Sequence, residues 1–180
     1  MNKTTPSLTL CPCTEAHVAG VQAIYAQAVE EGTASFELDP PSVAEMQARW
    51  SALVEGDFPY LVALRGGAVV GYAYAGPYRT RPAYRGTVEN SVYVRPDAQG
   101  TGVGRALLAE LIARCEAAGF RQMVAVIGDS ANAGSIGLHR SQGFQNAGVF
   151  RAVGWKHGRW LDSVLMQRPL GPGDTTDFDR

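Results

Sequence analysis

Residues that bind metals or form disulfide bonds are scarce in this sequence. Its 180 residues include three cysteines and three histidines. The cysteine number is odd, and Cys11 and Cys13 stand two apart in a strand-like run that points both to one face. No two histidines have the i,i+4 spacing of a helical metal pair. We therefore expect Cys11, Cys13 and Cys115 to be reduced core residues, and we expect no metal site.

An excess of charge of one sign is also missing. Sixteen Lys and Arg residues face 17 Asp and Glu residues, which gives a formal net charge of −1. No global field therefore attracts nucleic acid or an anionic membrane. No apolar run is long enough to span a bilayer, and residues 1–7 lack the apolar core of a secretory signal. We expect a cytoplasmic protein without nucleic-acid or membrane partners.

The length and the 46% hydrophobic content suit one compact domain. We place it at residues 8–170, between flexible tails at 1–7 and 171–180. Periodicity and turn signals predict alternating strands and helices, which indicates an α/β (α+β) fold. The predicted strands are 8–12, 60–64, 68–74, 87–95, 122–127, 149–155 and 160–168, and the predicted helices are 14–32, 42–54, 105–119 and 132–142.

The glycine-rich segment at residues 99–104 lies between a predicted strand and a predicted helix. Glycines let a backbone approach a ligand closely, and the first turn of the helix offers unpaired N–H groups, so the segment suits a diphosphate. Arg105-Ala106 follows where a kinase-type loop needs Lys and Ser/Thr, and the G-x-G-x-x-G spacing of dinucleotide folds is absent. The alternative is a tight turn without a ligand.

Three segments together resemble the GNAT family of N-acetyltransferases. The glycine segment reads Q-x-x-G-x-G, and residues 132–144 read N-x-x-S-x-x-L-H-x-x-x-G-F. The third set resembles the phosphinothricin acetyltransferase branch of that family, and it consists of residues 73–78, Arg81, Tyr84, 89–94, 154–160 and 167–168. The resemblance extends from about residue 8 to residue 170.

The resemblance implies a GNAT fold, with helices around a mixed sheet whose strands splay apart at the acetyl-CoA site. It implies direct transfer of acetyl from acetyl-CoA to the α-amine of a small amino acid, such as phosphinothricin or methionine sulfoximine. It also implies a homodimer, and Trp155 and Trp160 are candidates for its interface. The expected acetyl-CoA contacts are Val92, Tyr93, Val94, Gln99, Gly100, Thr101, Gly102, Val103, Gly104, Arg105, Asn132 and Ser135.

Two residues are candidates for proton transfer. A substrate ammonium must lose a proton before it attacks a thioester, and Glu89 matches the base of the family. Its alternative is a solvent-facing residue or a partner of Arg85. His139 stands where many relatives have the tyrosine that protonates the leaving thiolate, and an imidazole can titrate near neutral pH. Alternatively, His139 orients Glu89 or a water, or packs in the helix.

Positive charge precedes Glu89 in the segment at residues 78–85. A guanidinium there can hold a carboxylate or phosphinate in a bidentate pair. We expect Arg79, Arg81 and Tyr84 to bind substrate, with Phe36 as an aromatic wall. The alternatives are a solvated loop, contact with the 3′-phosphate of coenzyme A, and a core role for Phe36.

Competing functions for the whole chain are acetylation of a polyamine or a protein N-terminus, and a non-catalytic acyl-CoA-binding module.

Overall fold

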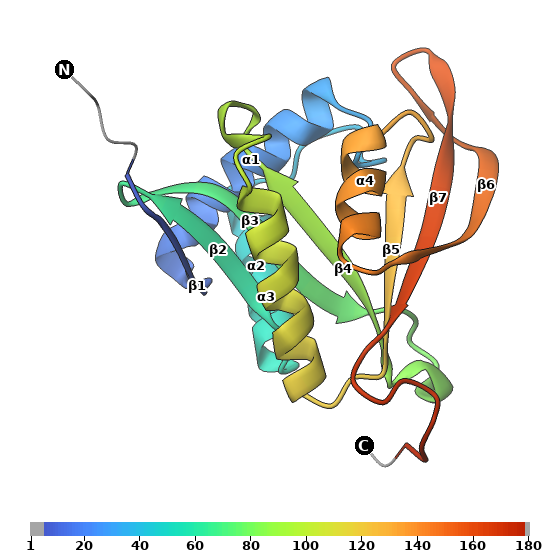
Figure 1. Cartoon of the computed structure of the whole chain (residues 1–180). Helices are drawn as coiled ribbons and strands as arrows, with labels where there is room; N and C mark the ends of the chain where they lie inside the picture. The colour runs from blue at the N-terminus through green and yellow to red at the C-terminus, as the bar shows by residue number, and fades with distance from the viewer. Residues whose placement is uncertain (1–5, 179–180) are drawn as a thin grey trace.

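The computed structural model describes residues 6–178, and seven strands in this part of the chain form a single mixed sheet (Figure 1). The strand order is β1-β2-β3-β4-β5-β7-β6, and β4 with β5 is its parallel pair. The bounds are β1 Leu8–Pro12, β2 Tyr60–Arg65, β3 Ala68–Pro77, β4 Thr87–Val94, β5 Gln122–Gly128, β6 Gln145–Lys156 and β7 Arg159–Pro169. The mixed α/β sheet expected from the sequence is confirmed.

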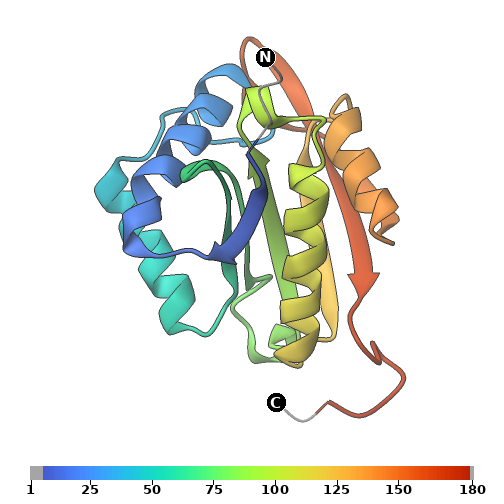
Figure 2. The same ribbon diagram turned by 60° about the vertical axis from the view of Figure 1, so that its left-hand side comes forward.

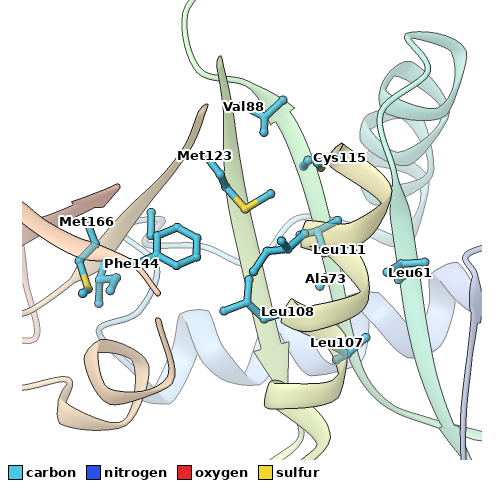
Figure 3. Close-up of a cluster of buried hydrophobic side chains, with 14 of the residues drawn as sticks. Leu61, Ala73, Val88, Leu107, Leu108, Leu111, Cys115, Met123, Phe144 and Met166 are labelled. Atoms are coloured by element: carbon cyan, nitrogen blue, oxygen red, sulfur yellow. The ribbon is translucent and has the colours of Figure 1, made fainter. Parts of the chain in front are cut away.

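Helices cover both faces of the sheet (Figure 2). One face carries α1 (Val18–Glu31) and α2 (Val43–Glu55), and the other carries α3 (Val103–Ala117) and α4 (Ala133–Ser141). The side chains of α3 form the larger core with the strands beneath them (Figure 3). Its buried members include Leu107, Leu108, Leu111, Ile112 and Cys115, the five residues that the periodicity of this helix predicts to face inward.

Local signals place the helix ends correctly. The Ser42 side chain accepts a hydrogen bond from the Glu45 backbone N–H and thereby caps α2. The first predicted helix begins as a short 3₁₀ turn at Glu15–His17, after Thr14, and continues as α1 up to Gly32. These caps satisfy backbone groups that a helix end leaves without partners.

The parallel pair β4 and β5 stays together over four residues only. Thr87–Asn90 pair with Gln122–Ala125, and beyond Asn90 the two strands have no pairing. On its other edge β4 continues to pair with β3 as far as Val94. The end of β4 therefore keeps one neighbour and loses the other, which is the splayed strand pair that the family resemblance implies.

The cysteine prediction is confirmed. Cys11, Cys13 and Cys115 are free, and Cys13 and Cys115 are buried. Cys11 packs with Cys13 in the core under α1 and α2. Burial raises the pKa of Cys13 to about 12, so this thiol stays protonated.

Two features at the C-terminal end differ from expectation. Strand β6 begins at Gln145 instead of 149, because register shifts at Asn146/Gly148 and Phe150/Gly154 break the alternation that reveals a strand. Residues 171–178, expected to be a flexible tail, instead turn back on the body of the protein, where Arg121 contacts three of them. Of the tails expected to be flexible, residues 1–5 and 179–180 lie outside the described residues.

Candidate active site

A large cleft opens where β4 leaves β5. Its volume is about 830 Å³. One wall is the end of β4 with the glycine segment, and the opposite wall is the start of α4. The expected acetyl-CoA contacts that line it are Val92, Tyr93, Val94, Gln99, Gly100, Gly102, Gly104, Arg105, Asn132 and Ser135. The sequence prediction therefore collects residues from both walls of one cleft.

The glycine segment forms a turn that exposes the first helical turn of α3. Gly100 and Gly102 have φ values of 70° and 87°, which side chains other than glycine rarely adopt. Gly102 is the N-cap of α3 and has no side chain to occupy the free N–H groups of the first turn. These N–H groups and the positive end of the helix dipole suit an anion such as a pyrophosphate.

Side chains around the glycine segment hold its shape. The Thr101 hydroxyl donates to the Ala98 carbonyl at 2.6 Å, and the Gln99 amide donates to the Val94 carbonyl at 3.1 Å. Arg65, at the end of β2, donates to Thr101 Oγ1 at 3.3 Å. The sequence analysis missed Arg65, because sheet pairing brings it to a segment 36 residues away.

Asn132 and Ser135 form the opposite wall at the start of α4. Asn132 is the N-cap residue, and its Oδ1 accepts a hydrogen bond from the Ser135 N–H at 3.1 Å. Its Nδ2 lies 3.5 Å from the Gly128 carbonyl at the end of β5. The two residues are thus fixed side by side at the edge of the cleft.

His139 is buried beneath that wall and is only 4% exposed. Its Nδ1 donates to the Ser135 carbonyl at 2.8 Å, and its Nε2 lies 2.9 Å from Asn90 Oδ1. Asn90 Nδ2 in turn donates to the Val124 carbonyl at 3.1 Å, which fixes the oxygen of the amide toward His139. Burial lowers the pKa of His139, and the hydrogen bond to Ser135 opposes this effect. When Nε2 is protonated, Asn90 Oδ1 can accept a hydrogen bond from it.

Glu89 lies on the opposite face of the sheet from His139. Side chains alternate along β4, so Glu89 points to the same side as Tyr93, which packs with the core under α1 and α2. Asn90 points to the side of α4 and His139. Glu89 and His139, the two predicted catalytic residues, therefore lie on opposite sides of the splayed strand. Within residues 6–178 they form no hydrogen bond with each other. Asn90 is the neighbour that sequence reasoning missed.

The carboxyl of Glu89 has a pKa above that of an ordinary glutamate. Burial raises its pKa, and the positive charge of Arg79 partly offsets this rise. Tyr74, on the neighbouring strand β3, lies within electrostatic range, and its phenol bonds to Ser91. Burial raises the pKa of Tyr74 as well, so the phenol stays protonated. Glu89 thus lies in a half-buried cluster of polar side chains with Tyr74 and Ser91.

The segment between β3 and β4 carries the predicted substrate residues. Residues 79–85 are exposed, and Pro82–Tyr84 form a short 3₁₀ turn (η2). The Tyr78 and Tyr84 rings meet edge to face at 5.7 Å, and the Arg79 guanidinium lies 5.0 Å from the Tyr78 ring centroid. Arg81 is the N-cap of the turn. The structure brings Arg79 into electrostatic range of Glu89 and leaves Arg81 exposed at the start of the turn.

Phe36 lies away from this segment, in the connection between α1 and α2. Its ring packs against Gly154 of β6. The connection is held by the buried Lys156, whose ammonium donates to the Ser35 carbonyl at 2.8 Å, and by Tyr25, which donates to Glu37 at 2.9 Å. Burial lowers the pKa of Lys156, and the charge of Glu37 opposes this effect. Ser35 and Glu37, the residues on both sides of Phe36, are therefore held in place by hydrogen bonds.

Across residues 6–178, no three His, Cys, Asp or Glu side chains come together in a group able to hold a metal ion. None of the helices in the same range has the length and apolar character needed to cross a membrane.

Splayed parallel strands, a glycine turn at a helix N-terminus and a half-buried carboxylate define an acyl-CoA-dependent transferase class. The family model described as "Acetyltransferase (GNAT) family" matches residues 21–144. The chain belongs to the GNAT family of acetyltransferases. It is therefore an enzyme, and the expectation that acetyl-CoA is its acetyl donor is confirmed.

Curated relatives and a solved structure agree with this assignment. The chain is 54% identical to phosphinothricin N-acetyltransferase of Alcaligenes faecalis, over 94% of this chain and 88% of that protein. It is 47% identical to L-methionine sulfoximine/L-methionine sulfone acetyltransferase of Pseudomonas paraeruginosa, over 87% and 91% of the two chains. The crystal structure of a phosphinothricin acetyltransferase from Sinorhizobium meliloti in complex with AcCoA matches with a TM-score of 0.92 and 50% identity, over 94% and 92%.

A negative charge placed in the glycine turn should block binding of acetyl-CoA. Acetyl-CoA at about a hundred times its dissociation constant should stabilise the native protein by roughly 2.7 kcal/mol, seen as a rise in Tm. Gly102→Glu should abolish this rise, because a carboxylate beside the first turn of α3 repels the pyrophosphate. Gly119→Glu is the matched control: Gly119, past the far end of α3, also has a positive φ and open space around it. An unchanged ligand-induced shift in Gly102→Glu would contradict the assignment.

Proposed function

We propose that this enzyme transfers the acetyl group of acetyl-CoA to the α-amine of a small amino acid, with phosphinothricin and methionine sulfoximine as the model substrates. The observation that carries the proposal is the position of Glu89, a half-buried carboxylate at the splayed end of β4 with Arg79 in range. The high identity to enzymes named for these two substrates supports the same substrate class.

Catalysis begins with binding of acetyl-CoA in the cleft. The turn at residues 100–104 holds the pyrophosphate, and the unpaired edge of β4 beyond Asn90 faces the pantetheine arm. Backbone N–H groups near Val92 and Val94 are placed to stabilise the oxyanion that forms as the amine attacks the thioester carbonyl. The cofactor thus takes the place that β5 leaves along the splayed strand.

Glu89 then removes a proton from the substrate ammonium. An α-ammonium has a pKa near 8, so most substrate arrives protonated. A base with a raised pKa accepts this proton better than an ordinary glutamate, directly or through a water. The attack is direct: the residues that line the cleft include no cysteine, and the buried Cys13 thiol is protonated. The transfer therefore takes place in a ternary complex of enzyme, acetyl-CoA and amine.

His139 acts at the opposite side of the strand. The collapse of the tetrahedral intermediate releases a thiolate that needs a proton or a positive dipole nearby. The His139 ring is held by Ser135 and Asn90 next to the cleft. We assign the leaving group to this side, and the amine to the side of Glu89. The amine thus loses its proton on one face of the strand, and the thiolate leaves on the other face, beside the dipole of the His139 ring.

Arg79 and Arg81 set the substrate class. Two guanidinium groups stand on an exposed segment beside Glu89 in a chain of net charge −1. A carboxylate or phosphinate held there leaves the α-amine directed toward Glu89. A polyamine would bring positive charge to the same place and would be repelled. The arrangement therefore favours an anionic amino acid over a polyamine.

Replacement of Glu89 should slow the chemical step. Glu89→Gln keeps the size of the side chain but removes the base, so kcat should fall by about 10²–10⁴ at neutral pH. Binding of acetyl-CoA, measured by calorimetry, should persist. The wild-type kcat should rise with pH along a limb above the ordinary pKa of a glutamate, because a base works deprotonated and burial raises the pKa of Glu89. Near-normal kcat in Glu89→Gln would assign the base role to another group.

Replacement of Arg81 should weaken binding of the amino acid. The loss of a charge-assisted pair costs about 1.5–3 kcal/mol, so Arg81→Ala should raise KM for phosphinothricin by about 10- to 150-fold. KM for acetyl-CoA should stay nearly constant. A coenzyme A release assay with phosphinothricin, methionine sulfoximine, spermidine and a peptide with a free N-terminus compares the candidates. Fastest turnover of spermidine or the peptide would refute the amino-acid substrate.

We also propose a homodimer that forms through the β6–β7 hairpin. Its large exposed apolar residues are Val149, Phe150, Val153, Trp155 and Trp160. Trp155 and Trp160 are 57% and 61% exposed, and their rings meet at 5.3 Å. Strand β6 is also one of the two edge strands of the sheet. An apolar patch on an open edge is typical of an interface between subunits.

Charge in this patch should separate the subunits. Trp155→Glu should convert a dimer into a monomer in sedimentation velocity experiments, because a carboxylate would be buried without a partner. Leu38→Glu is the matched control, since Leu38 is 66% exposed and lies outside the hairpin. A monomeric wild-type protein at micromolar concentration would contradict the proposal.

We infer a cytoplasmic location from the free state of Cys11, Cys13 and Cys115. Reducing compartments keep thiols in this state.

A further inference from the structure

We propose that Phe178 and Arg121 are positioning residues for the substrate segment 79–85, and that the C-terminal tail thereby tunes binding of the amino acid. The inference rests on the proposed function of that segment. It starts from residues 171–178, which pack under the lower ends of β4 and β5 beside the segment between β3 and β4 (Figure 1).

Arg121 holds the tail in a defined path. Its guanidinium donates to the Gly173 carbonyl at 3.1 Å, to Thr176 Oγ1 at 2.9 Å and to the Asp177 carbonyl at 2.7 Å. The tail itself starts from a fixed point, because Leu170 is fully buried and its N–H donates to the Arg121 carbonyl at 2.9 Å. One half-buried side chain therefore contacts three residues of the tail in succession.

The same residue is bonded to the start of β4. The backbone N–H of Arg121 donates to the Gly86 carbonyl at 2.8 Å, and the N–H of Gln122 donates to it at 3.2 Å. Gly86 immediately follows the substrate segment and precedes Glu89 by three residues. Arg121 thus connects the tail to the point where the substrate segment enters the sheet.

Phe178 covers this point directly. A Cβ atom on Gly86 would lie 2.9 Å from Phe178 Cζ, so the ring rests on the glycine backbone and leaves no room for a side chain. The guanidinium groups of Arg85 and Arg121 lie 5.1 Å and 5.7 Å from the ring centroid, within the range of cation–π contacts. The Phe178 ring therefore packs against Gly86 and against the guanidinium groups of Arg85 and Arg121.

This contact matters because it holds the end of the substrate segment that enters β4. Residues 79–85 are exposed, and Gly86 is the first buried position after them. Within the segment the backbone contacts are local, from Tyr84 to Arg81 and from Arg85 to Pro82. The turn that begins at Arg81 and runs to Arg85 is therefore anchored to the sheet at Gly86, the position that Phe178 covers. Loss of the ring frees the segment without a change in the acetyl-CoA cleft, which lies at the other end of β4.

The test measures segment mobility and substrate binding in the full-length protein. Phe178→Ala should raise KM for phosphinothricin by about 3- to 30-fold, the range expected for coupling through packed contacts. KM for acetyl-CoA should change little. Limited trypsin digestion should cleave after Arg79 and Arg85 several times faster than in the wild type, as located by mass spectrometry. Gly86→Ala, which displaces the ring from the other side, should have the same effects.

Two controls isolate the contact. Phe178→Tyr keeps the ring and should restore wild-type values, and Asp174→Ala changes an exposed residue of the same tail and should have no effect. Unchanged trypsin cleavage in Phe178→Ala would overturn the inference whatever the kinetics. Faster cleavage with unchanged KM for phosphinothricin would overturn it too. If Arg81→Ala then also leaves that KM unchanged, the proposed function of the segment fails as well, whereas a raised KM in Arg81→Ala retains it.

Discussion

The separation of β4 from β5 after Asn90 is the constraint on which the rest of the site depends. Four residues of pairing hold the two strands together, and the remaining half of β4 keeps a free edge. Unpaired backbone groups in a protein interior are costly unless a partner satisfies them. The Asn90 side chain donates across the gap to the Val124 carbonyl of β5, and we propose that acetyl-CoA pairs with the free edge of β4. The proposed cofactor site is thus the unpaired edge of β4 beyond Asn90.

The same strand separates the two residues for which we propose catalytic roles. Because side chains alternate along β4, Glu89 faces the substrate segment while Asn90 faces His139. Burial acts on both groups in the direction that disfavours charge, raising the pKa of Glu89 and lowering that of His139. Opposite pKa shifts of two neighbouring titratable groups are typical of acid and base assignments, and we propose these roles for His139 and Glu89.

Support for the site comes from parts of the chain that are remote in sequence. Arg65 reaches the glycine turn from β2, Lys156 holds the connection that carries Phe36, and Arg121 joins the tail to Gly86. Arg65 and Arg121 lie outside the segments that carry the family resemblance, and Lys156 lies within one of them, at residues 154–160. Each acts by fixing the backbone of a segment that carries a proposed ligand contact, which keeps flexible side chains within a narrow range of positions.

The sequence by itself determined the elements, the family and the glycine turn, because periodicity, caps and glycine spacing are local properties. Ser42 with Glu45 and the five apolar residues of α3 are examples. Only the tertiary structure decided which groups meet: His139 with Asn90 across 49 residues, Arg65 with Thr101, and Phe178 with Gly86. It also revised the start of β6, where bulges hide the alternation, and the path of the tail. Contacts of this kind depend on strand order and register, which no local pattern encodes.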